Sequence, residues 1–508
     1  MAIFFIVVIA SLLVASLLHW WFNFKRPSVK HVKGPPSPSF WLGHQRVLRD
    51  QDNAGDLETK WRREYGTLYR ISGCLDQDVL VVCDPIVFGH VFNPSRPYPK
   101  SNDSVFVLDL LAGKGLAVVA SEPHHRQRKI LNPAFSTTQL RNSQFIFQQC
   151  SDKLVSGIKG YLAGTGSSNI INIRAWTSKT TLDIIGLAAF RYDFTSIDGS
   201  NTELEQATRH VFTASQADPS ASELILVDLM RMLPDPVLEL LRLVPTREFR
   251  QLISVRKVAE KTAREIMARH NGVQTPEGVG DVLDVLAKAR LAGKIQDEEV
   301  EAQLMTFIVA ASETTGTSVS WLLYELAVHP EYQSIIRGEL KQSDDYDSLP
   351  FFNAAIKESL RLHPNAPSLV RTAPHDDVLP LSGGKALTVP KGQTLVCSAF
   401  LYNRLPSLWG DDAEEWNPAR FLDNDMSVSL GVYANLMTFG TGPRSCIGWR
   451  FAVMEIQTIL ANLILNFEFS LPEGGVEILR FPGSPAVVPI VKGEAHLGSQ
   501  LPLRMRVL

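Results

Sequence analysis

Residues 439–448 read Phe-Gly-Thr-Gly-Pro-Arg-Ser-Cys-Ile-Gly and lead directly into an apolar helical run that begins at Trp449 and ends near Phe467. The two glycines before Cys446 permit a tight turn and let the backbone approach a flat ligand closely. A cysteine at the start of a helix is stabilised as a thiolate by the positive end of the helix dipole and by free backbone N–H groups. A single thiolate favours haem iron over a zinc site, because zinc needs several protein ligands. The alternative is a buried structural cysteine on a glycine turn.

The composition is that of a folded protein. The 508 residues are 45% hydrophobic, which excludes a largely disordered chain. The 50 Lys and Arg residues are balanced by 53 Asp and Glu residues, giving a net charge of −3, and this balance argues against a nucleic-acid-binding protein. The five cysteines are too few and too scattered for a disulfide framework and are typical of a reducing compartment.

The first 24 residues predict a membrane anchor. Between Ala2 and Phe24 no side chain is charged, and a helix of this length would reach about 34 Å, against about 30 Å for the hydrocarbon core of a bilayer. Aromatic residues near its end, and Lys25 and Arg26 directly after it, orient the rest of the chain towards the cytosol. The alternative is a cleaved signal peptide, but bulky aromatic residues occupy the place of a cleavage site.

The chain therefore divides into a transmembrane signal-anchor helix (residues 1–24), a basic and Pro-rich hinge (25–39) and one catalytic domain (40–508). In this domain, Asp297 is expected to cap the longest helix, which would extend for about 48 Å until Pro330 ends it. The fold class is mainly α with a minor β-sheet. Apolar periodicity predicts helices over residues 57–65, 145–161, 175–190, 249–271 and 297–329, and short strands over 67–72, 79–82, 386–389 and 394–398.

Residues 439–448 resemble the haem-binding signature of the cytochrome P-450 enzymes, F-G-x-G-x-R-x-C-x-G, and match it at every fixed position. The chain is similar to the membrane-anchored eukaryotic members of this family, in the style of the fungal ones, over nearly its full length. The resemblance implies a cytochrome P-450 fold behind the transmembrane helix, with heme b (iron protoporphyrin IX) as the cofactor. It makes Cys446 the axial ligand of the iron, Arg444 a partner of a haem propionate, and Phe439 part of the haem-binding segment.

Residues 310–315, Ala-Ala-Ser-Glu-Thr-Thr, lie within the long helix and resemble the oxygen-activation motif of the family, in which glycine usually stands in the place of Ala311. A hydroxyl inside a helix can bond back to a preceding carbonyl group and bend the helix, which makes room for oxygen and water. The resemblance implies that Thr314 supports oxygen activation and that Glu313 supplies protons through water. The methyl group of Ala311 predicts a narrower groove and slower or less coupled turnover. The alternative is a polar facet on the solvent side of a helix.

Glu358 and Arg361 are spaced to share one helix face. Taken alone they predict a surface ion pair worth a few tenths of a kcal/mol. The resemblance adds Arg420 as a third member, and it implies that the three charges are buried together and brace the core beside the cysteine segment.

Residues 124–128, His-His-Arg-Gln-Arg, resemble the W-x-x-x-R helix of the family. His124 stands in the tryptophan place, where it can still donate an N–H to a propionate, and Arg128 stands in the arginine place, where a guanidinium pairs bidentately with a carboxylate. Arg371 also resembles a propionate-binding arginine. The alternatives are two surface histidines and a loop arginine, and no second metal site is expected.

A haem–thiolate centre needs electrons, and the sequence shows no Gly-rich dinucleotide loop and no flavin domain. The resemblance implies NADPH-cytochrome P-450 reductase as the electron donor, with cytochrome b5 as a second candidate. Arg126, Arg128, Lys129 and Arg450 predict a positive face for an acidic partner, although a solvated run of charges explains the exposed ones equally well. No nucleic-acid partner is expected.

Residues 224–244 are apolar and are interrupted by Pro234 and Pro236. By position they resemble roof helices that touch the bilayer and admit lipophilic molecules, and a core helix pair is the equal alternative. Residues 106–108 and 368–370 are candidate lining of a substrate pocket.

These motifs together favour a monooxygenase that inserts one atom of O2 into a lipophilic small molecule, by hydroxylation or epoxidation. By analogy with fungal members, the product would be a secondary metabolite such as a terpenoid or polyketide. We expect a single-pass protein of the endoplasmic reticulum membrane. Two alternatives remain open: a haem–thiolate isomerase or dehydratase that takes its oxygen from peroxide substrates, and a non-catalytic, membrane-tethered haem carrier or sensor. The presence of Glu313 and Thr314 argues against both.

Overall fold

A computed structural model describes residues 29–164, 169–199, 203–209, 219–233, 235–242, 246–270, 280–422, 430–482 and 484–508. The predicted membrane anchor and the first residues of the predicted hinge lie outside these ranges. Within them, no helix is both apolar enough and long enough to span a bilayer.

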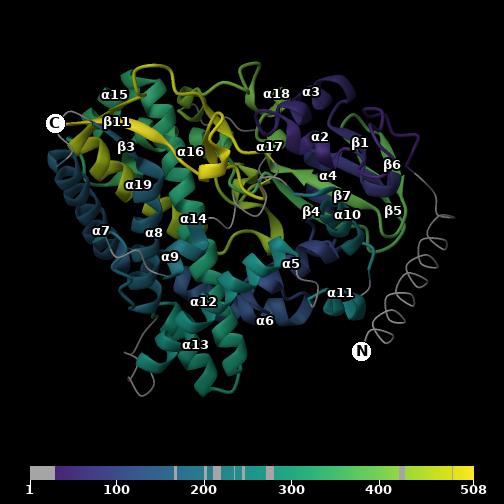
Figure 1. Cartoon of the computed structure of the whole chain (residues 1–508), viewed down its shortest axis with the longest axis horizontal. Coiled ribbons are helices and arrows are strands. Elements are labelled where there is room, and N and C mark those ends of the chain that lie inside the picture. Colours follow the sequence, from purple (N-terminus) through teal and green to yellow (C-terminus); the bar gives the residue numbers. More distant parts are fainter. Residues whose placement is uncertain are drawn as a thin grey trace.

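Helices make up most of the described chain (Figure 1). The helices predicted from periodicity are all present, and the one predicted over residues 145–161 is longer than expected. In chain order the helices are α2 (Gln45–Asp50), α3 (Asp56–Tyr65), α4 (Pro85–Val91), α5 (Asn102–Ala112), α6 (Ser121–Leu131), α7 (Thr137–Gly164), α8 (Ile173–Phe190), α9 (Glu203–Arg209), α10 (Ala221–Met230), α11 (Asp235–Leu241), α12 (Arg247–His270), α13 (Val282–Leu291), α14 (Asp297–Val328), α15 (Pro330–Leu340), α16 (Pro350–Leu362), α17 (Ala399–Tyr402), α18 (Pro406–Trp409) and α19 (Trp449–Asn466).

The strands form small sheets, as the minor β content predicted. The largest has the order β1–β2–β7–β4 and consists of β1 (Leu68–Ser72), β2 (Asp78–Val82), β7 (Thr394–Ser398) and β4 (Ser368–Thr372). Its central pair, β2 and β7, is parallel, with Val79 opposite Thr394, and its other two pairs are antiparallel. The remaining strands pair β5 (Asp377–Pro380) with β6 (Ala386–Val389), β9 (Ile478–Arg480) with β10 (Pro489–Val491), and β11 (Pro502–Val507) with β3 (Ile170–Asn172) and β8 (Phe467–Ser470).

The sheet and the long helices occupy different sides of the molecule. Figure 1 shows β1, β4 and β7 on one side, close to α2 and α3, and α7, α8 and α19 on the other. α14 runs through the middle and packs against α8, α12, α16 and α19. This arrangement places the motif at residues 310–315 in the interior of the protein, and it excludes a solvent-side helix for that motif.

The start of α14 differs in one detail from the sequence prediction. Gln296, and not Asp297, is the N-cap residue. The backbone N–H of Gln296 donates to the carboxylate of Glu299 at 3.1 Å, which is half of a capping box. Asp297 lies instead in the first turn, where its charge favours the helix N-terminus.

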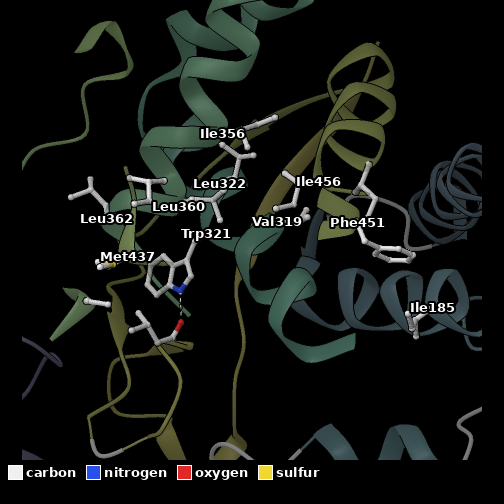
Figure 2. Close-up of a cluster of buried hydrophobic side chains, with 14 of the residues drawn as sticks. Ile185, Val319, Trp321, Leu322, Ile356, Leu360, Leu362, Met437, Phe451 and Ile456 are labelled. Carbon is white, nitrogen blue, oxygen red and sulfur yellow. Dashed lines mark hydrogen bonds between the residues drawn. The ribbon is translucent and has the colours of Figure 1, made fainter. Parts of the chain in front are cut away.

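A buried apolar cluster joins α14 to its neighbours (Figure 2). At its centre Trp321, which is 1% exposed, donates its indole N–H to the carbonyl of Val487 at 2.8 Å. This contact ties α14 to the chain segment just before β10. The other labelled side chains are Val319 and Leu322 from α14, Ile356, Leu360 and Leu362 from α16, Phe451 and Ile456 from α19, Ile185 from α8, and Met437.

Candidate active site

A cavity of about 480 Å³ lies where α14, the cysteine segment and the chain before β4 meet. Cys446 is exposed towards this cavity, whereas the other four cysteines are buried. The structural alternative for Cys446, a thiol packed into the core, is therefore not what the fold shows. Most of the cavity wall is apolar, with Phe92, Leu108, Phe135, Ile185, Phe307, Ala310, Ala311, Leu369, Met437, Phe439, Phe451, Ile456 and Ala486 among its lining side chains.

Two glycines shape the turn that presents Cys446. Gly440 and Gly442 both have φ of +68°, a left-handed conformation that other residues avoid. A Cβ atom on Gly442 would lie 2.5 Å from the carbonyl oxygen of Phe92, so a larger residue does not fit there. The backbone N–H of Cys446 donates to the carbonyl of Phe439 at 2.8 Å and closes the turn.

The electrostatic surroundings of Cys446 differ from the sequence prediction. Although Cys446 faces the cavity, protein surrounds it on the other sides, and this desolvation raises the pKa of its thiol; the N–H of Gly448 and the charge of Arg128 act in the opposite direction. The predicted stabilisation of the thiolate at the helix start is thus present but smaller than the cost of desolvation. Cys446 would be held as a thiolate when it coordinates a metal ion, because coordination lowers the pKa of a thiol.

Basic side chains gather at one edge of the cavity. Arg371 and Arg444 line it, and Arg128 reaches the cysteine segment, with Nη1 donating to the carbonyl of Ser445 at 2.7 Å. Nη1 of Arg444 is buried and has no hydrogen-bond partner among the described residues. His124 is buried beside them; burial and the neighbouring charges of Arg444 and Arg128 lower its pKa to about 4, so that it is a neutral hydrogen-bond donor at pH 7.

Lys100 also belongs to this basic group, and the sequence analysis missed it. Its Nζ donates to the carbonyl of Ala117 at 2.5 Å. Burial, together with the charges of Arg371 and Arg444, lowers the pKa of Lys100 to about 7. No local spacing marks Lys100, because its link to Arg371 is an isolated β-bridge between distant parts of the chain.

The donor set fits haem. A thiol, a mainly apolar wall and a group of cations meet in one cavity, and no carboxylate of the described residues forms an ion pair with Arg128, Arg371, Arg444 or Lys100. Two carboxylates on the edge of a flat apolar ligand would satisfy these cations, including the unpartnered nitrogen of Arg444. No group of three or more His, Cys, Asp or Glu side chains in the described part of the chain could hold a metal ion, which argues against a zinc site.

One face of α14 opens onto the cavity. Ala310, Ala311, Thr314, Thr315 and Ser318 line it, and their spacing is that of a single helix face. Oγ1 of Thr314 donates to the carbonyl of Ala310 at 2.7 Å, the back-bond expected of a hydroxyl inside a helix. The structure thus places Thr314 and Ala311 at the wall that also carries Cys446.

Glu313 lies on another face of the same helix. Its carboxylate forms an ion pair with Arg174 of α8 and accepts a hydrogen bond from Oγ of Ser178 at 2.8 Å. The side chain is 5% exposed and does not line the cavity. The structure therefore separates Glu313 from Thr314, and Glu313 would have to leave this ion pair and take up a proton before it could donate one. The pairing partner stands 139 positions away in the chain, so no local motif could reveal it.

Glu358, Arg361 and Arg420 meet in the interior. Nε of Arg361 lies 2.7 Å from one carboxylate oxygen of Glu358, and Nε of Arg420 lies 3.0 Å from the other. The side chains of Glu358 and Arg361 are completely buried, so this is no surface pair. Arg361 also donates to the carbonyl of Asn403 at 2.6 Å, and the side chain of Asn403 accepts from the N–H of Met437 at 3.0 Å. The charged group thereby supports the start of the cysteine segment.

Of the residues predicted to line a pocket, the structure brings only some to the cavity. Leu108 and Leu369 line it, whereas Phe106 is buried among Met230, Phe249 and other apolar side chains. Met230 of α10 and Leu238 of α11 are buried in that cluster, as a core helix pair requires, whereas Leu240 is exposed and most other apolar side chains of the two helices are half-buried. Pro234, Leu243 and Val244 lie outside the described residues. Asn365 and Pro485 also line the cavity, and no sequence motif marked them.

Arg126 does not contribute a free charge to the predicted positive face for a partner. Arg126 donates to the carboxylate of Glu299 at 2.6 Å and is thus neutralised within the protein. Lys129 is exposed on α6, and Arg450 is exposed at the start of α19, directly after the cysteine segment. These two residues, with the half-buried Arg128, remain as the cationic surface near Cys446.

Comparisons with known proteins show which family the chain belongs to. A family model described as "Cytochrome P-450" matches residues 33–495. Cytochrome P-450 monooxygenase 205 of Postia placenta is 32% identical over 94% of this chain and 93% of its own length. Cytochrome P-450 monooxygenase 128 of the same fungus is 31% identical over 94% of this chain and 92% of its own length. Cytochrome P-450 monooxygenase claQ of Ampulloclitocybe clavipes is 29% identical over 95% of this chain and 94% of its own length. The chain belongs to the cytochrome P-450 family, and it is a P-450 monooxygenase, an oxidoreductase.

Proposed function

We propose that this monooxygenase inserts one atom of O2 into a lipophilic small molecule, by hydroxylation or epoxidation. The observation that carries the proposal is that Cys446 and Thr314 line one largely apolar cavity. Heme b, when bound through Cys446, supplies the reductive activation of O2. Arg128, Arg371, Arg444, Lys100 and His124 would hold its propionates.

The residues of α14 orient water and exclude it from the rest of the cavity. Because Oγ1 of Thr314 donates its proton to the carbonyl of Ala310, its lone pairs can accept a hydrogen bond from a water molecule in the cavity. The methyl groups of Ala310 and Ala311 line the wall before it, and Thr315 and Ser318 line the wall after it. We assign Glu313 the supply of protons through water: its carboxylate would leave Arg174 and Ser178, take up a proton from solvent water and pass it on.

We also propose that electrons come from NADPH through cytochrome P-450 reductase, with cytochrome b5 as an alternative donor. The exposed Lys129 and Arg450 support an acidic partner on the thiol side of the site. The sequence of residues 1–24 supports a single-pass anchor in the endoplasmic reticulum membrane with the catalytic domain in the cytosol. By analogy with fungal members of the family, we propose a secondary metabolite, such as a terpenoid or polyketide, as the substrate.

Two measurements test the proposal. The reduced full-length protein under carbon monoxide should show the absorption band of a thiolate-ligated haem, and the Cys446→Ala variant should not. Co-expression with a reductase under isotopically labelled oxygen should then yield a host metabolite that carries one labelled atom. Product formation from a peroxide substrate without reductase would favour the isomerase or dehydratase class. A haem-loaded protein that never consumes NADPH would favour a carrier or sensor.

A further inference from the structure

A polar cleft of about 550 Å³ lies where α3, the end of α17 and β9 meet. It is separate from the cavity that contains Cys446, because the two have no described lining residue in common. Among the described residues that line the cleft, only Phe400 is apolar, and most of the others are charged. Such a wall suits an ion better than a lipophilic molecule, because charged groups that lose water need a charged or polar partner in its place.

The ring of Phe400 holds two guanidinium groups at the cleft. Cζ of Arg404 lies 3.7 Å from the centroid of the ring, and Cζ of Arg480 lies 5.4 Å from it. A Cβ atom on Gly55 would lie 2.3 Å from Cζ of Phe400, so a larger residue there would displace the ring. The two cations are close enough for the charge of Arg480, added to burial, to lower the pKa of Arg404. Two like charges held in this way favour an anion beside them.

Arg404 is a buried cation without a carboxylate in contact. It is 5% exposed, and its hydrogen bonds within the described part of the chain go to two carbonyls, that of Phe400 at 3.3 Å and that of Leu362. These bonds use two of the five N–H groups of a guanidinium. Glu414 and Glu325 act on its charge without forming an ion pair with it. A buried charge left in this state is costly, and a bound anion would remove much of the cost.

Positive charge exceeds negative charge at the cleft. Arg404 and Arg480 line it together with Lys60 and Arg63, against three carboxylates. Two of these are already paired, Asp56 with Arg480 at 3.1 Å and Glu414 with both Arg63 and its neighbour Arg62; the third, Glu64, is exposed to solvent. With Arg62 included, five positive charges meet three negative ones, an excess of two. A phosphate monoester, with a charge of about −1.5 to −2 at pH 7, would balance this excess.

We propose that this cleft binds a phosphate monoester, with the guanidinium groups of Arg404 and Arg480 as its main donors and Lys60 at the rim. Guanidinium N–H groups match the oxygens of a phosphate in planar, bidentate pairs. The cleft is several times larger than a phosphate group, so the rest of a larger molecule fits beside it. Two sources bring this chemistry: the headgroup of an anionic lipid such as phosphatidic acid, and a soluble phosphate ester.

The test is equilibrium dialysis of the haem-loaded, full-length protein in non-ionic detergent against radiolabelled inorganic phosphate at constant ionic strength. We expect saturable binding of one phosphate per chain, with a Kd of about 1 mM or below. Arg404→Met removes the charge but keeps an unbranched side chain, and it should weaken binding about tenfold or more, because charge-assisted hydrogen bonds are lost. Arg480→Met should have the same effect, and it decides the matter where Arg404→Met does not fold. Lys385→Gln is the matched control: it changes the net charge equally at an exposed residue outside the cleft, and it should bind phosphate as tightly as the wild type.

Displacement of the bound label distinguishes the two sources. Glycerol 3-phosphate is one competitor, and phosphatidylcholine vesicles with and without phosphatidic acid are the other. Displacement only by the vesicles that contain phosphatidic acid, with or without displacement by glycerol 3-phosphate, supports a lipid headgroup, and displacement by glycerol 3-phosphate alone supports a soluble ester. Phosphate that neither monoester displaces, or that pure phosphatidylcholine displaces equally well, contradicts the proposal. So does a wild-type protein without saturable binding, binding that is undiminished in Arg404→Met and Arg480→Met, or binding that is weakened to the same extent in Lys385→Gln.

Discussion

Glu358 illustrates how much a single buried charge can hold together. Its two carboxylate oxygens bind Arg361 and Arg420, and both the acid and Arg361 are fully removed from solvent. Through Asn403 the same group supports Met437 at the start of the cysteine segment. Motif spacing predicts the Glu358–Arg361 pair, but the carbonyls that bind the rest of the Arg361 guanidinium come from three other places in the chain.

Glu358→Gln should therefore lower the free energy of unfolding by about 3–5 kcal/mol, because it leaves the buried guanidinium of Arg361 without a counter-charge, while Arg420 keeps its ion pair with Asp412 at 2.9 Å. Urea unfolding followed by circular dichroism measures this. The control is Glu468→Gln, which breaks an ion pair with Arg506 at the surface and should cost less than about 1 kcal/mol. Equal losses in the two variants would contradict a special role for the buried group.

A second prediction at this scale concerns pH. Burial would raise the pKa of Asp377, but hydrogen bonds from His90 at 2.8 Å and Tyr98 at 2.7 Å outweigh it and lower the pKa from 3.8 to about 2. Because the folded pKa lies below the unfolded one, the charged Asp377 stabilises the protein above about pH 4, and this stabilisation disappears as the pH falls towards 2. It amounts to roughly 2 kcal/mol. The difference in unfolding free energy between wild type and Asp377→Asn should shrink over this range; a constant difference would contradict the assignment.

At the scale of the element, α14 decides which side chains reach the cavity. Apolar periodicity and the final proline predict the helix correctly, and the motif at residues 310–315 predicts that the helix carries the oxygen site. Neither could tell which face carries which residue, because the helix is buried nearly all round. The structure separates Thr314, on the cavity face, from Glu313, on the α8 face, and this separation depends on contacts with Arg174 and Ser178 that are remote in sequence.

Thr314→Ala should reduce the product formed per NADPH by a factor of roughly ten while the haem spectrum stays unchanged, since it removes a cavity hydroxyl that orients water. The matched control is Ser312→Ala. Ser312 makes the same kind of back-bond, to the carbonyl of Ile308 at 3.0 Å, but it is buried and does not line the cavity. Coupling that falls to the same extent in both variants would show that the helix back-bond, and not the position at the cavity, causes the effect.

At the scale of the whole molecule, the cavity lies between parts of the chain that no local pattern connects. The cysteine segment could be recognised from ten consecutive residues. Lys100 and Asn365 could not, because Lys100 joins the site through a bridge to Arg371, and Asn365 joins it through a bond to the carbonyl of Thr314. α10 also connects distant parts of the chain, because it contacts both α5 and the turn before β2.

Asp228 is the centre of that link. It is 1% exposed and accepts from the N–H of Cys74 at 2.7 Å and from Nε2 of Gln45 at 3.1 Å, on the sheet side of the molecule. It also pairs with Arg231 at 2.9 Å, and Arg231 in turn pairs with Asp103 of α5 at 2.8 Å. One buried carboxylate thus connects α10 and, through Arg231, α5 to the sheet side of the molecule.

Asp228→Asn should weaken the attachment of α10 without unfolding the protein, because the amide keeps one acceptor but loses the charge that pairs with Arg231. A loss of roughly 1–3 kcal/mol in this link corresponds to hydrogen exchange of the α10 amides that is about tenfold faster or more, measured by mass spectrometry on the haem-loaded protein. Glu239→Gln on the next helix, α11, is the control, since Glu239 is largely exposed and pairs with Arg242 at the surface. Exchange in α14 should stay as slow as in the wild type in both variants. If the α10 amides exchange no faster in Asp228→Asn than in Glu239→Gln, α10 is held in place by apolar packing against α5 and α12 and not by this carboxylate.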